Sequence, residues 1–337
     1  MALLFFTGFE NEDGYEGDYV EGIVQSATQK RSGNYSAYSS SSIGYLRHDI
    51  SGVEVTFILG GACFVNTNSS WWGLILSNDV GVQASVYARA YGDGSGRVVA
   101  RRGDWNGTTL QSGTKPIYTQ TWYYIETKIT INNSTGSVIV NIDEVEDINI
   151  SGVNTQQQAA ATVTNAKFGM PTAGYFYMDD LYVCDTTGSV NNDFLGPVRV
   201  EGLQPSGNGY NSDFVGSDAD STDNYLHVDE VPADDDTSYI KSSTNGHIDS
   251  FALGNLTGSV NSIKGIKVNS VAKVSDTFAR NYKNLVRVNG TNYLGSDNNP
   301  DTSYNNNFDI WEEDPDTATG WTETGVNAIE VGVEITS

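Results

Sequence analysis

The segment Thr121-Trp-Tyr-Tyr-Ile-Glu-Thr-Lys-Ile-Thr-Ile131 decides the fold class of this chain. Every second residue from Tyr123 to Ile131 shares one side of an extended chain, and these residues are mostly apolar, which is the pattern of a half-buried β-strand. Asn133-Ser-Thr-Gly136 follows as a turn, and apolar residues then recur at alternate positions from Val138 to Ile142. The segment therefore predicts a β-hairpin with one buried face.

Alternating runs of the same kind lie on both sides of this hairpin. They are Val53–Leu59, Ile266–Val274 and Ile329–Ile335. In the last run, outward carboxylates such as Glu330 and Glu334 are typical of an edge strand that avoids stray pairing. Between the last two runs, Leu285–Val288 leads into Asn289-Gly290, a dipeptide preferred in type I′ hairpin turns, and the chain returns through Thr291–Leu294.

Composition also favours strands over helices. The chain contains 36 glycines and 19 tyrosines, which suit short strands and tight turns. Runs of good helix formers are scarce, and residues 155–164 are the one place where we expect a short helical turn. The predicted fold class is all-β.

Length and composition predict two domains in tandem. A chain of 337 residues is long enough for two separate hydrophobic cores. The small polar residues after Cys184 are typical of a linker. We therefore predict an antiparallel, jelly-roll-like β-sandwich over residues 1–188, a linker over 189–196 and a second β-sandwich over 197–337, opened by Val198 and Val200.

The strong negative charge limits the classes of partner. The formal net charge is −24 and the sequence pI is about 4.2. Such a chain repels phosphate backbones and anionic membranes, so we expect neither nucleic-acid binding nor membrane insertion. The segment Met1–Glu10 predicts a first β-strand rather than an export signal. The acidity is typical of a highly soluble surface, and calcium binding by acidic clusters is the alternative interpretation.

Three segments carry a family resemblance. They are Leu4-Phe-Phe-Thr-Gly-Phe-Glu10, the hairpin that begins at Thr121, and Met178-Asp-Asp-Leu-Tyr-Val183. These segments resemble the concanavalin A-like lectin/glucanase superfamily in its laminin-G-like jelly-roll form. The resemblance implies that the first and last strands of the sandwich lie side by side, which brings Glu10 close to Asp179.

A second resemblance covers most of the chain. Phe194-Leu-Gly-Pro-Val-Arg-Val200 and the stretch from Asp314 to Val333 resemble phage structural and tail-associated proteins that carry this sandwich. It implies a bacteriophage virion protein on the particle surface, assembled in the host cytoplasm and released by lysis. Its expected partners are other virion proteins, further copies of itself in a homo-oligomer, and a host surface glycan. The absence of shaft repeats favours capsid decoration or a head fibre, whereas the lectin-like sandwich favours a tail fibre or another tail component in contact with the host.

Three tryptophans are the candidate carbohydrate-binding residues. Lectin sites stack sugar rings on exposed aromatic side chains, and Trp71, Trp72 and Trp105 all lie beside turn residues. Core packing or a subunit interface is the alternative role for these three, because aromatic residues are enriched in interfaces too. Trp122 begins a strand and is expected in the core.

Two acidic groups are the candidate calcium ligands, since Ca²⁺ takes carboxylate and carbonyl oxygens from loops. Glu10 and Asp179 form the first group, which rests on the family resemblance. Asp218 and Asp220 form the second, because they begin with the Asp-x-Asp spacing of a calcium loop. The second group lacks the glycine and glutamate that complete an EF-hand, and solvated acids are the alternative in both places.

Catalytic motifs were sought and not found. The paired carboxylates of a glycan hydrolase have their nearest match in Asp143-Glu-Val-Glu-Asp147, where the spacing is wrong. The three histidines lack metal-ligand spacing, and Cys63 and Cys184 are expected to be buried free thiols. We therefore expect a non-enzymatic virion structural protein. A stand-alone carbohydrate-binding lectin is the first alternative, and a glycan hydrolase is the second.

Overall fold

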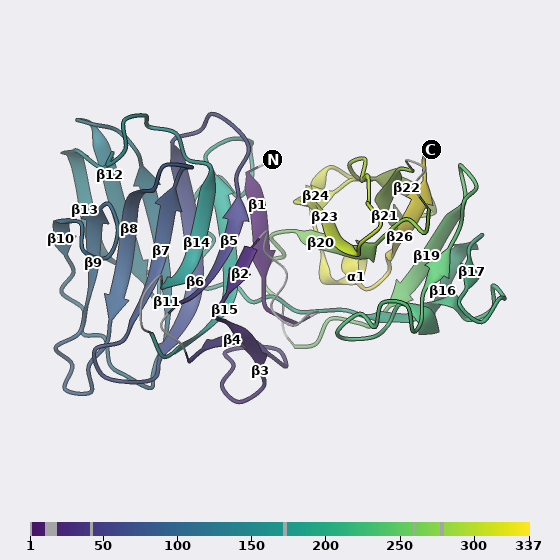
Figure 1. The fold of residues 1–337 in the computed structure, drawn as a ribbon, viewed down its shortest axis with the longest axis horizontal. Coiled ribbons are helices and arrows are strands. Elements are labelled where there is room, and N and C mark those ends of the chain that lie inside the picture. Colours follow the sequence, from purple (N-terminus) through teal and green to yellow (C-terminus); the bar gives the residue numbers. More distant parts are fainter. Residues whose placement is uncertain (1, 11–18, 41–42, 171–173, 259, 277–279) are drawn as a thin grey trace. The chain divides into compact units, whose positions relative to one another are not determined.

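The computed structural model describes residues 2–10, 19–40, 43–170, 174–258, 260–276 and 280–337. The chain divides into two compact units, Met1–Glu201 and Gly202–Ser337. Antiparallel strands make up almost all of the regular structure in both units (Figure 1), which confirms the all-β fold class. Residues 197–201, which we assigned to the second domain, belong to the first unit.

The first unit contains an eight-stranded sheet. Seven strands follow the order β13-β12-β11-β6-β15-β4-β3, and the N-terminal strand β1 pairs with β15. Their bounds are β1 Leu3–Thr7, β3 Val24–Ser26, β4 Ser36–Ser39, β6 Thr56–Val65, β11 Trp122–Thr130, β12 Gly136–Ile142, β13 Val145–Val153 and β15 Phe176–Asp185. The first strand therefore lies beside the last one, as the resemblance implied.

A seven-stranded sheet forms the second layer of this unit. Its order is β10-β9-β8-β7-β14-β5-β2. The bounds are β2 Tyr19–Glu21, β5 Gly44–Asp49, β7 Trp71–Ser77, β8 Val82–Arg89, β9 Arg97–Arg102, β10 Thr108–Ser112 and β14 Asn165–Met170.

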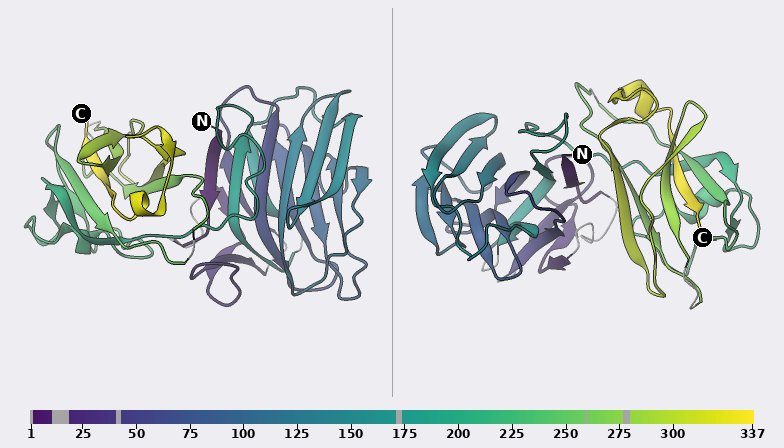
Figure 2. Two further views of the ribbon diagram at one scale, coloured as in Figure 1. Left: turned by 180° about the vertical axis from the view of Figure 1, so that it is seen from behind. Right: turned by 90° about the horizontal axis from the view of Figure 1, so that it is seen from above.

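The two sheets pack face to face as a β-sandwich (Figure 2). Gly61 marks the contact between them, because a Cβ built on it would lie 3.4 Å from ring carbons of Trp72 on the opposite sheet. Both cysteines are buried free thiols, as predicted. The apolar side chains between the sheets form the core that stabilises this unit.

The predicted hairpin is confirmed as β11 and β12, with Val138, Val140 and Ile142 fully buried. The run before it was predicted less well. Strand β6 begins only at Thr56, and Val53 is 92% exposed. Both faces of β6 are buried along most of its length. The alternation of apolar and polar residues that begins at Val53 therefore did not mark the start of this strand.

The second unit is built on a five-stranded sheet in the order β16-β19-β26-β21-β22. Its strands are β16 Pro205–Ser212, β19 Ile248–Leu253, β21 Tyr282–Val288, β22 Thr291–Leu294 and β26 Glu330–Ile335. Three two-stranded sheets accompany it: β17 Val215–Gly216 with β18 Ile240–Lys241, β20 Ile266–Ala272 with β23 Asn305–Trp311, and β24 Glu313–Asp314 with β25 Thr319–Gly320. Two single-turn helices, η1 Asn224–His227 and α1 Glu323–Val326, complete the described part of this unit.

A separate core holds the second unit together. Val286 and Val288 of β21 pack with Val268 of β20 and with Trp321 and Val326. The predicted hairpin at Asn289-Gly290 is confirmed, because both residues have the positive φ angles of a type I′ turn. The edge-strand prediction for Glu330–Ile335 is wrong, since β26 pairs with β19 on one side and β21 on the other.

The predicted helical turn at residues 155–164 does not form. The Gln83 side chain engages this backbone instead, accepting from the N–H groups of Gln157 and Gln158 and donating to the carbonyl oxygens of Ala160 and Thr162. No helix in the described residues is long and apolar enough to cross a bilayer.

Candidate functional site

Adjacent tryptophans on β7 point to opposite sides of the seven-stranded sheet. Trp72 is 1% exposed and faces the other sheet, so it belongs to the core and not to a sugar site. Trp71 is half-buried on the side that points away from the other sheet. We call this side the outer face; Trp71, Arg89 and Lys167 are among its residues.

Arg89 lies over two aromatic rings of this face. Its guanidinium carbon is 4.9 Å from the ring centre of Trp71, its direct cross-strand partner, and 4.8 Å from that of Tyr91. Such contacts are favourable because the ring faces carry partial negative charge. Among the described residues Arg89 has no hydrogen-bond or ion-pair partner, and its Nε atom is buried. Its terminal N–H groups therefore have no acceptor within the part of the chain that the structure describes, whereas the buried Nε atom is out of a ligand's reach.

Tyr87 connects two of the predicted tryptophans. Its ring lies over Gly73, where an added Cβ would come within 2.4 Å, and it makes an edge contact with Trp71 at 6.2 Å. Burial raises the pKa of the Tyr87 hydroxyl, and the backbone of Trp105 lowers it by a smaller amount. Trp105 is 37% exposed in the turn between β9 and β10. The Trp71 ring and the Trp105 backbone therefore both lie near Tyr87.

A second group of aromatic and basic residues extends the outer face toward β2. The Lys167 ammonium lies 5.6 Å from the ring centre of Tyr45, and the Arg47 guanidinium lies 5.3 Å from that of Tyr19. The two tyrosine rings are themselves 5.9 Å apart. Burial and the Glu21 carboxylate raise the pKa of Tyr45 to about 12, so its hydroxyl stays protonated near neutral pH. Sequence reasoning missed this group, although the alternation of Tyr45 with Arg47 on β5 was a usable signal.

Charge is divided unequally between the two sheets. The strands of the seven-stranded sheet carry six basic and two acidic residues, whereas those of the eight-stranded sheet carry one basic and six acidic residues. The six basic residues are Arg47, Arg89, Arg97, Arg101, Arg102 and Lys167. All of them except Arg102 occupy positions of the outer face.

The first predicted calcium group is occupied by backbone donors. The Glu10 carboxylate accepts from the N–H groups of Asn34 and Tyr35, and Asp179 Oδ2 accepts from those of Arg31 and Ser32. These two acids hold opposite ends of one turn. Among the described residues no three His, Cys, Asp or Glu side chains gather where they could hold a metal ion, so the structure gives no support to the calcium prediction at Glu10 and Asp179.

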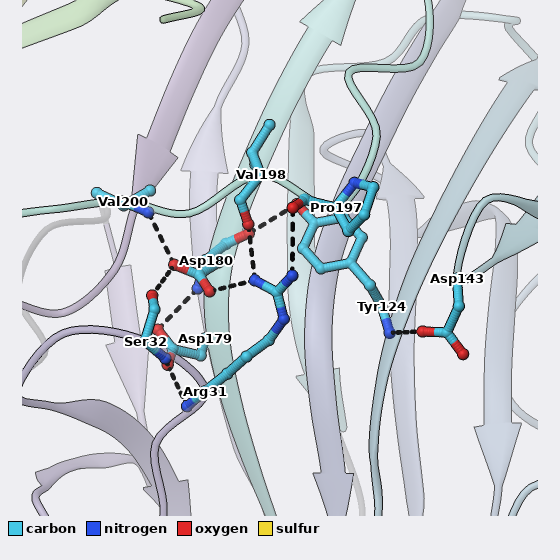
Figure 3. Close-up of polar contacts among 9 residues, drawn as sticks. All are labelled: Arg31, Ser32, Tyr124, Asp143, Asp179, Asp180, Pro197, Val198 and Val200. Atoms are coloured by element: carbon cyan, nitrogen blue, oxygen red, sulfur yellow. Dashed lines mark hydrogen bonds and ion pairs between the residues drawn. The ribbon is translucent and has the colours of Figure 1, made fainter. Parts of the chain in front are cut away.

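Asp180 is the centre of a buried polar network (Figure 3). One carboxylate oxygen pairs with the Arg31 guanidinium at 2.5 Å, and the other accepts from the Ser32 hydroxyl and the Val200 N–H. Arg31 also donates to the carbonyl oxygen of Val198. Residues 197–200 therefore attach to the first sandwich. The prediction that Val198 and Val200 open the second set of strands is wrong. Sequence reasoning did not anticipate a role for Arg31.

The second predicted calcium group lies in the second unit and is also engaged. Asp218 Oδ1 accepts from the Asp220 N–H, and Asp218 Oδ2 lies 3.3 Å from His227 Nε2. The backbone hydrogen bond holds the pKa of Asp218 below its usual value. Asp220 accepts in turn from the Thr222 N–H. These contacts form a local turn and assemble no metal site among the described residues.

Burial in the Asp180 network predicts a pH dependence of stability. Desolvation and the adjacent Asp180 charge raise the pKa of Asp179 to about 8, although backbone N–H groups partly offset them. Between about pH 4 and pH 8 the folded chain therefore holds a proton that the unfolded chain has lost. The free energy of unfolding should fall as pH rises through this window, by up to about 1.4 kcal/mol per pH unit for one proton. Urea unfolding of the full chain at pH 5 to 8, followed by hydrogen exchange in the first unit, measures this slope.

Asp179→Asn is the informative variant for this pH dependence, because it removes the titrating group. Its pH slope should be shallower than that of the parent chain. Asp193→Asn is the control, because the Asp193 side chain is 66% exposed, and its slope should match that of the parent. Equal slopes in the parent and Asp179→Asn would contradict the prediction.

Comparison with known proteins identifies no family for this chain. No family model matches the chain, and no curated protein matches its sequence. Solved structures that are similar to part of the chain include the alginate lyase Aly36B (14% identity, 50% of this chain and 88% of that one, TM-score 0.37). Others are the galectin LEC-6 of Caenorhabditis elegans (11%, 41% and 89%, 0.29) and a carbohydrate esterase of the Shiga toxin-encoding bacteriophage phi24B (12%, 53% and 99%, 0.36). At these identities and TM-scores the likeness carries no information about activity or ligand.

Proposed function

We propose that this chain is a non-enzymatic glycan-binding protein and that the outer face of its seven-stranded sheet is the binding surface. The observation that carries the proposal is the stacking of Arg89 on Trp71 and Tyr91. Sugar rings bind to proteins through aromatic faces, while polar groups fix their hydroxyls. Here half-buried aromatic rings and the unpartnered N–H donors of Arg89 lie together at one end of the outer face, beside the fully buried Tyr87.

Replacement of Trp71 by alanine tests this proposal. Truncation of a central tryptophan in a binding surface commonly costs 2 kcal/mol or more, so glycan affinity should fall roughly 30-fold or more. The fold should persist, because Trp71 is half-buried on the outer face and lies outside the core between the sheets. Binding of the full chain to an array of bacterial surface polysaccharides measures the affinity, and circular dichroism checks the fold.

Trp122→Ala provides the matched control for Trp71→Ala. Trp122 is also a half-buried tryptophan at the start of a strand, but it lies on the eight-stranded sheet and packs against Phe64 at 5.5 Å. Its replacement should leave glycan affinity unchanged. Equal binding by the parent and Trp71→Ala would place the ligand elsewhere.

The assignment as a non-enzyme is supported by the contacts of the nearest candidate carboxylates. Asp143 accepts from the Tyr124 N–H and pairs with the Lys115 ammonium at 2.9 Å. Asp147 accepts from the N–H groups of Thr114 and Lys115. Both acids thus stabilise local backbone. Release of reducing ends from any polysaccharide that the chain binds would overturn this assignment.

We further propose that the chain is a surface component of a bacteriophage virion, where it assembles as a homo-oligomer with other virion proteins. The resemblance of both halves of the sequence to phage structural proteins supports this role, and the net charge of −24 suits a protein displayed at high density. Immunogold electron microscopy of purified particles tests it. Gold over the head would indicate a decoration or head-fibre protein, and gold on the tail would indicate an adsorption component. Unlabelled particles in a lysate that contains the protein would overturn the virion role and leave the stand-alone lectin.

A further inference from the structure

We infer that the outer face binds an anionic polysaccharide, whose carboxylate or sulfate groups are held by Arg89 and Lys167. This inference rests on the glycan-binding function proposed above and specifies the chemical class of the ligand. It follows from the arrangement of charge on this one face of the sheet.

The positive charge of the face stands out against the rest of the chain. The whole sequence has 42 acidic and 18 basic residues, yet five basic side chains occupy outer-face positions of a single sheet. Only Glu21 and Asp49 oppose them on these strands. The excess of acidic residues elsewhere would repel a polyanion, so among the strands described in the first unit this face is the surface that best suits one.

Basic side chains are also direct cross-strand partners on this face. Arg97 of β9 is opposite Arg89 of β8, and Lys167 of β14 is opposite Arg47 of β5. Like charges directly opposite one another destabilise a sheet. Asp49 offsets this for Arg47, to which it lies within 2.8 Å. An anionic group between the members of either pair would replace repulsion with attraction.

The remaining charges of the face have no acidic partner. Arg97 donates to the carbonyl oxygens of Gly94 and Gly96, and Arg101 donates to a carbonyl and a hydroxyl oxygen. These neutral acceptors fix the side chains without cancelling their charge. Among the described residues, Lys167 and Arg89 have no ion-pair partner and contact aromatic rings instead.

The row of outer-face residues is long enough for a polymer. Direct partners link Arg101, Ser85, Ile75, Lys167, Arg47 and Tyr19 across six neighbouring strands. With strands about 4.8 Å apart, the row spans roughly 24 Å. Arg101 lies at one end of this row, and Lys167 and Arg47 lie toward the other end beside Tyr19. Ser85 and Ile75 in the middle are 0% and 1% exposed, so the longer basic and aromatic side chains around them would make the contacts with a sugar chain that bears an anionic group at intervals.

Matched polymers separate charge recognition from sugar recognition. Affinities of the full chain would be measured for polygalacturonate and hyaluronate, each against its carboxyl-reduced form, and for dextran sulfate against dextran, with duplex DNA as a further polyanion. We expect an acidic polymer to bind roughly 10-fold or more tightly than its neutral counterpart, because a hydrogen bond to a charged group contributes about 1.5–3 kcal/mol. The preferred pair identifies carboxylate or sulfate as the anion. Added salt should weaken binding to the acidic form.

Two charge-removing variants test the assigned residues. Arg89→Gln and Lys167→Gln should each lower affinity for the acidic polymer roughly 10-fold. Arg102→Gln and Lys128→Gln are the matched controls, since Arg102 occupies an inner-face position and Lys128 lies on the other sheet. Both controls should bind like the parent chain.

The outcomes distinguish this inference from the function on which it rests. Equal affinity for acidic and neutral forms, with loss of both in Trp71→Ala, would overturn the anionic ligand and retain glycan binding. Unchanged affinity in Arg89→Gln and Lys167→Gln would also overturn the inference. DNA binding as tight as that of the acidic glycans would show a non-selective polyanion surface, and failure to bind any glycan would reject the proposed function itself.

Discussion

Replacement of Trp72 by alanine is expected to lower the free energy of unfolding of the first unit by about 3–5 kcal/mol. Trp72 is 1% exposed and is among the largest fully buried side chains. It fills the space opposite Gly61 on the other sheet, where an added Cβ would already lie 3.4 Å from its ring. Truncation would remove the contacts of the indole and leave a cavity that two rigid sheets cannot close.

Trp72→Phe is expected to lower the free energy of unfolding less than Trp72→Ala does, partly because of the indole nitrogen. Among the described residues this buried N–H has no acceptor, and an unpaired buried donor is itself unfavourable. Trp72→Phe leaves a smaller cavity and removes the donor, so it should cost less than Trp72→Ala. Urea unfolding of the full chain, followed by hydrogen exchange in each unit separately, gives these values. A loss below about 1 kcal/mol for Trp72→Ala would show that Trp72 is not a core residue.

Replacement of Asp180 by alanine should destabilise the first unit by a similar amount, about 3–5 kcal/mol. The Asp180 carboxylate is fully buried and is the charged partner of Arg31, whose side chain is 18% exposed. Its loss would leave a mostly buried guanidinium without a counter-charge, and it would also leave the Ser32 hydroxyl and the Val200 N–H without their acceptor. Removing one member of a buried ion pair costs far more than a surface ion pair contributes.

A double-mutant cycle isolates the coupling between Asp180 and Arg31. Arg31→Met removes the guanidinium but keeps an apolar chain over the ring of Tyr124, on which Arg31 now stacks at 4.7 Å. The double variant should therefore be less destabilised than the sum of the two single variants. Asp180→Asn is a useful companion, because asparagine tolerates the positive φ of 52° at this position better than alanine does. Additive losses in the cycle would show that the pair contributes nothing beyond its separate contacts.

Most of the strand architecture could be predicted from local sequence. The hairpins at 121–142 and 285–294 follow from apolar alternation and turn residues, which depend only on neighbours in the chain. The failures have non-local causes. The Gln83 side chain holds residues 157–162 without a helix, and pairing on both sides makes β26 a central strand.

The candidate site could be predicted in part. Exposed tryptophans beside turns led to Trp71 and Trp105, which the structure places near the shared Tyr87. The prediction that Trp72 binds carbohydrate was wrong, because adjacent residues of a strand face opposite sides and the sequence alone did not say which side faced the core. The basic residues of the outer face were missed because they lie on β5, β8, β9 and β14, far apart in the chain.

The sequence by itself determined the all-β class, the buried thiols and the positions of the best hairpins, because strand periodicity and turn chemistry are local properties. Only the tertiary structure decided what Asp179, Asp180 and Glu10 do. The turn at residues 31–35 supplies the N–H groups that occupy the oxygens of Glu10 and Asp179. The Arg31 guanidinium, the Ser32 hydroxyl and the Val200 N–H occupy those of Asp180. Only the tertiary structure, likewise, gathered basic and aromatic side chains onto one face, since cross-strand register joins residues that the sequence separates.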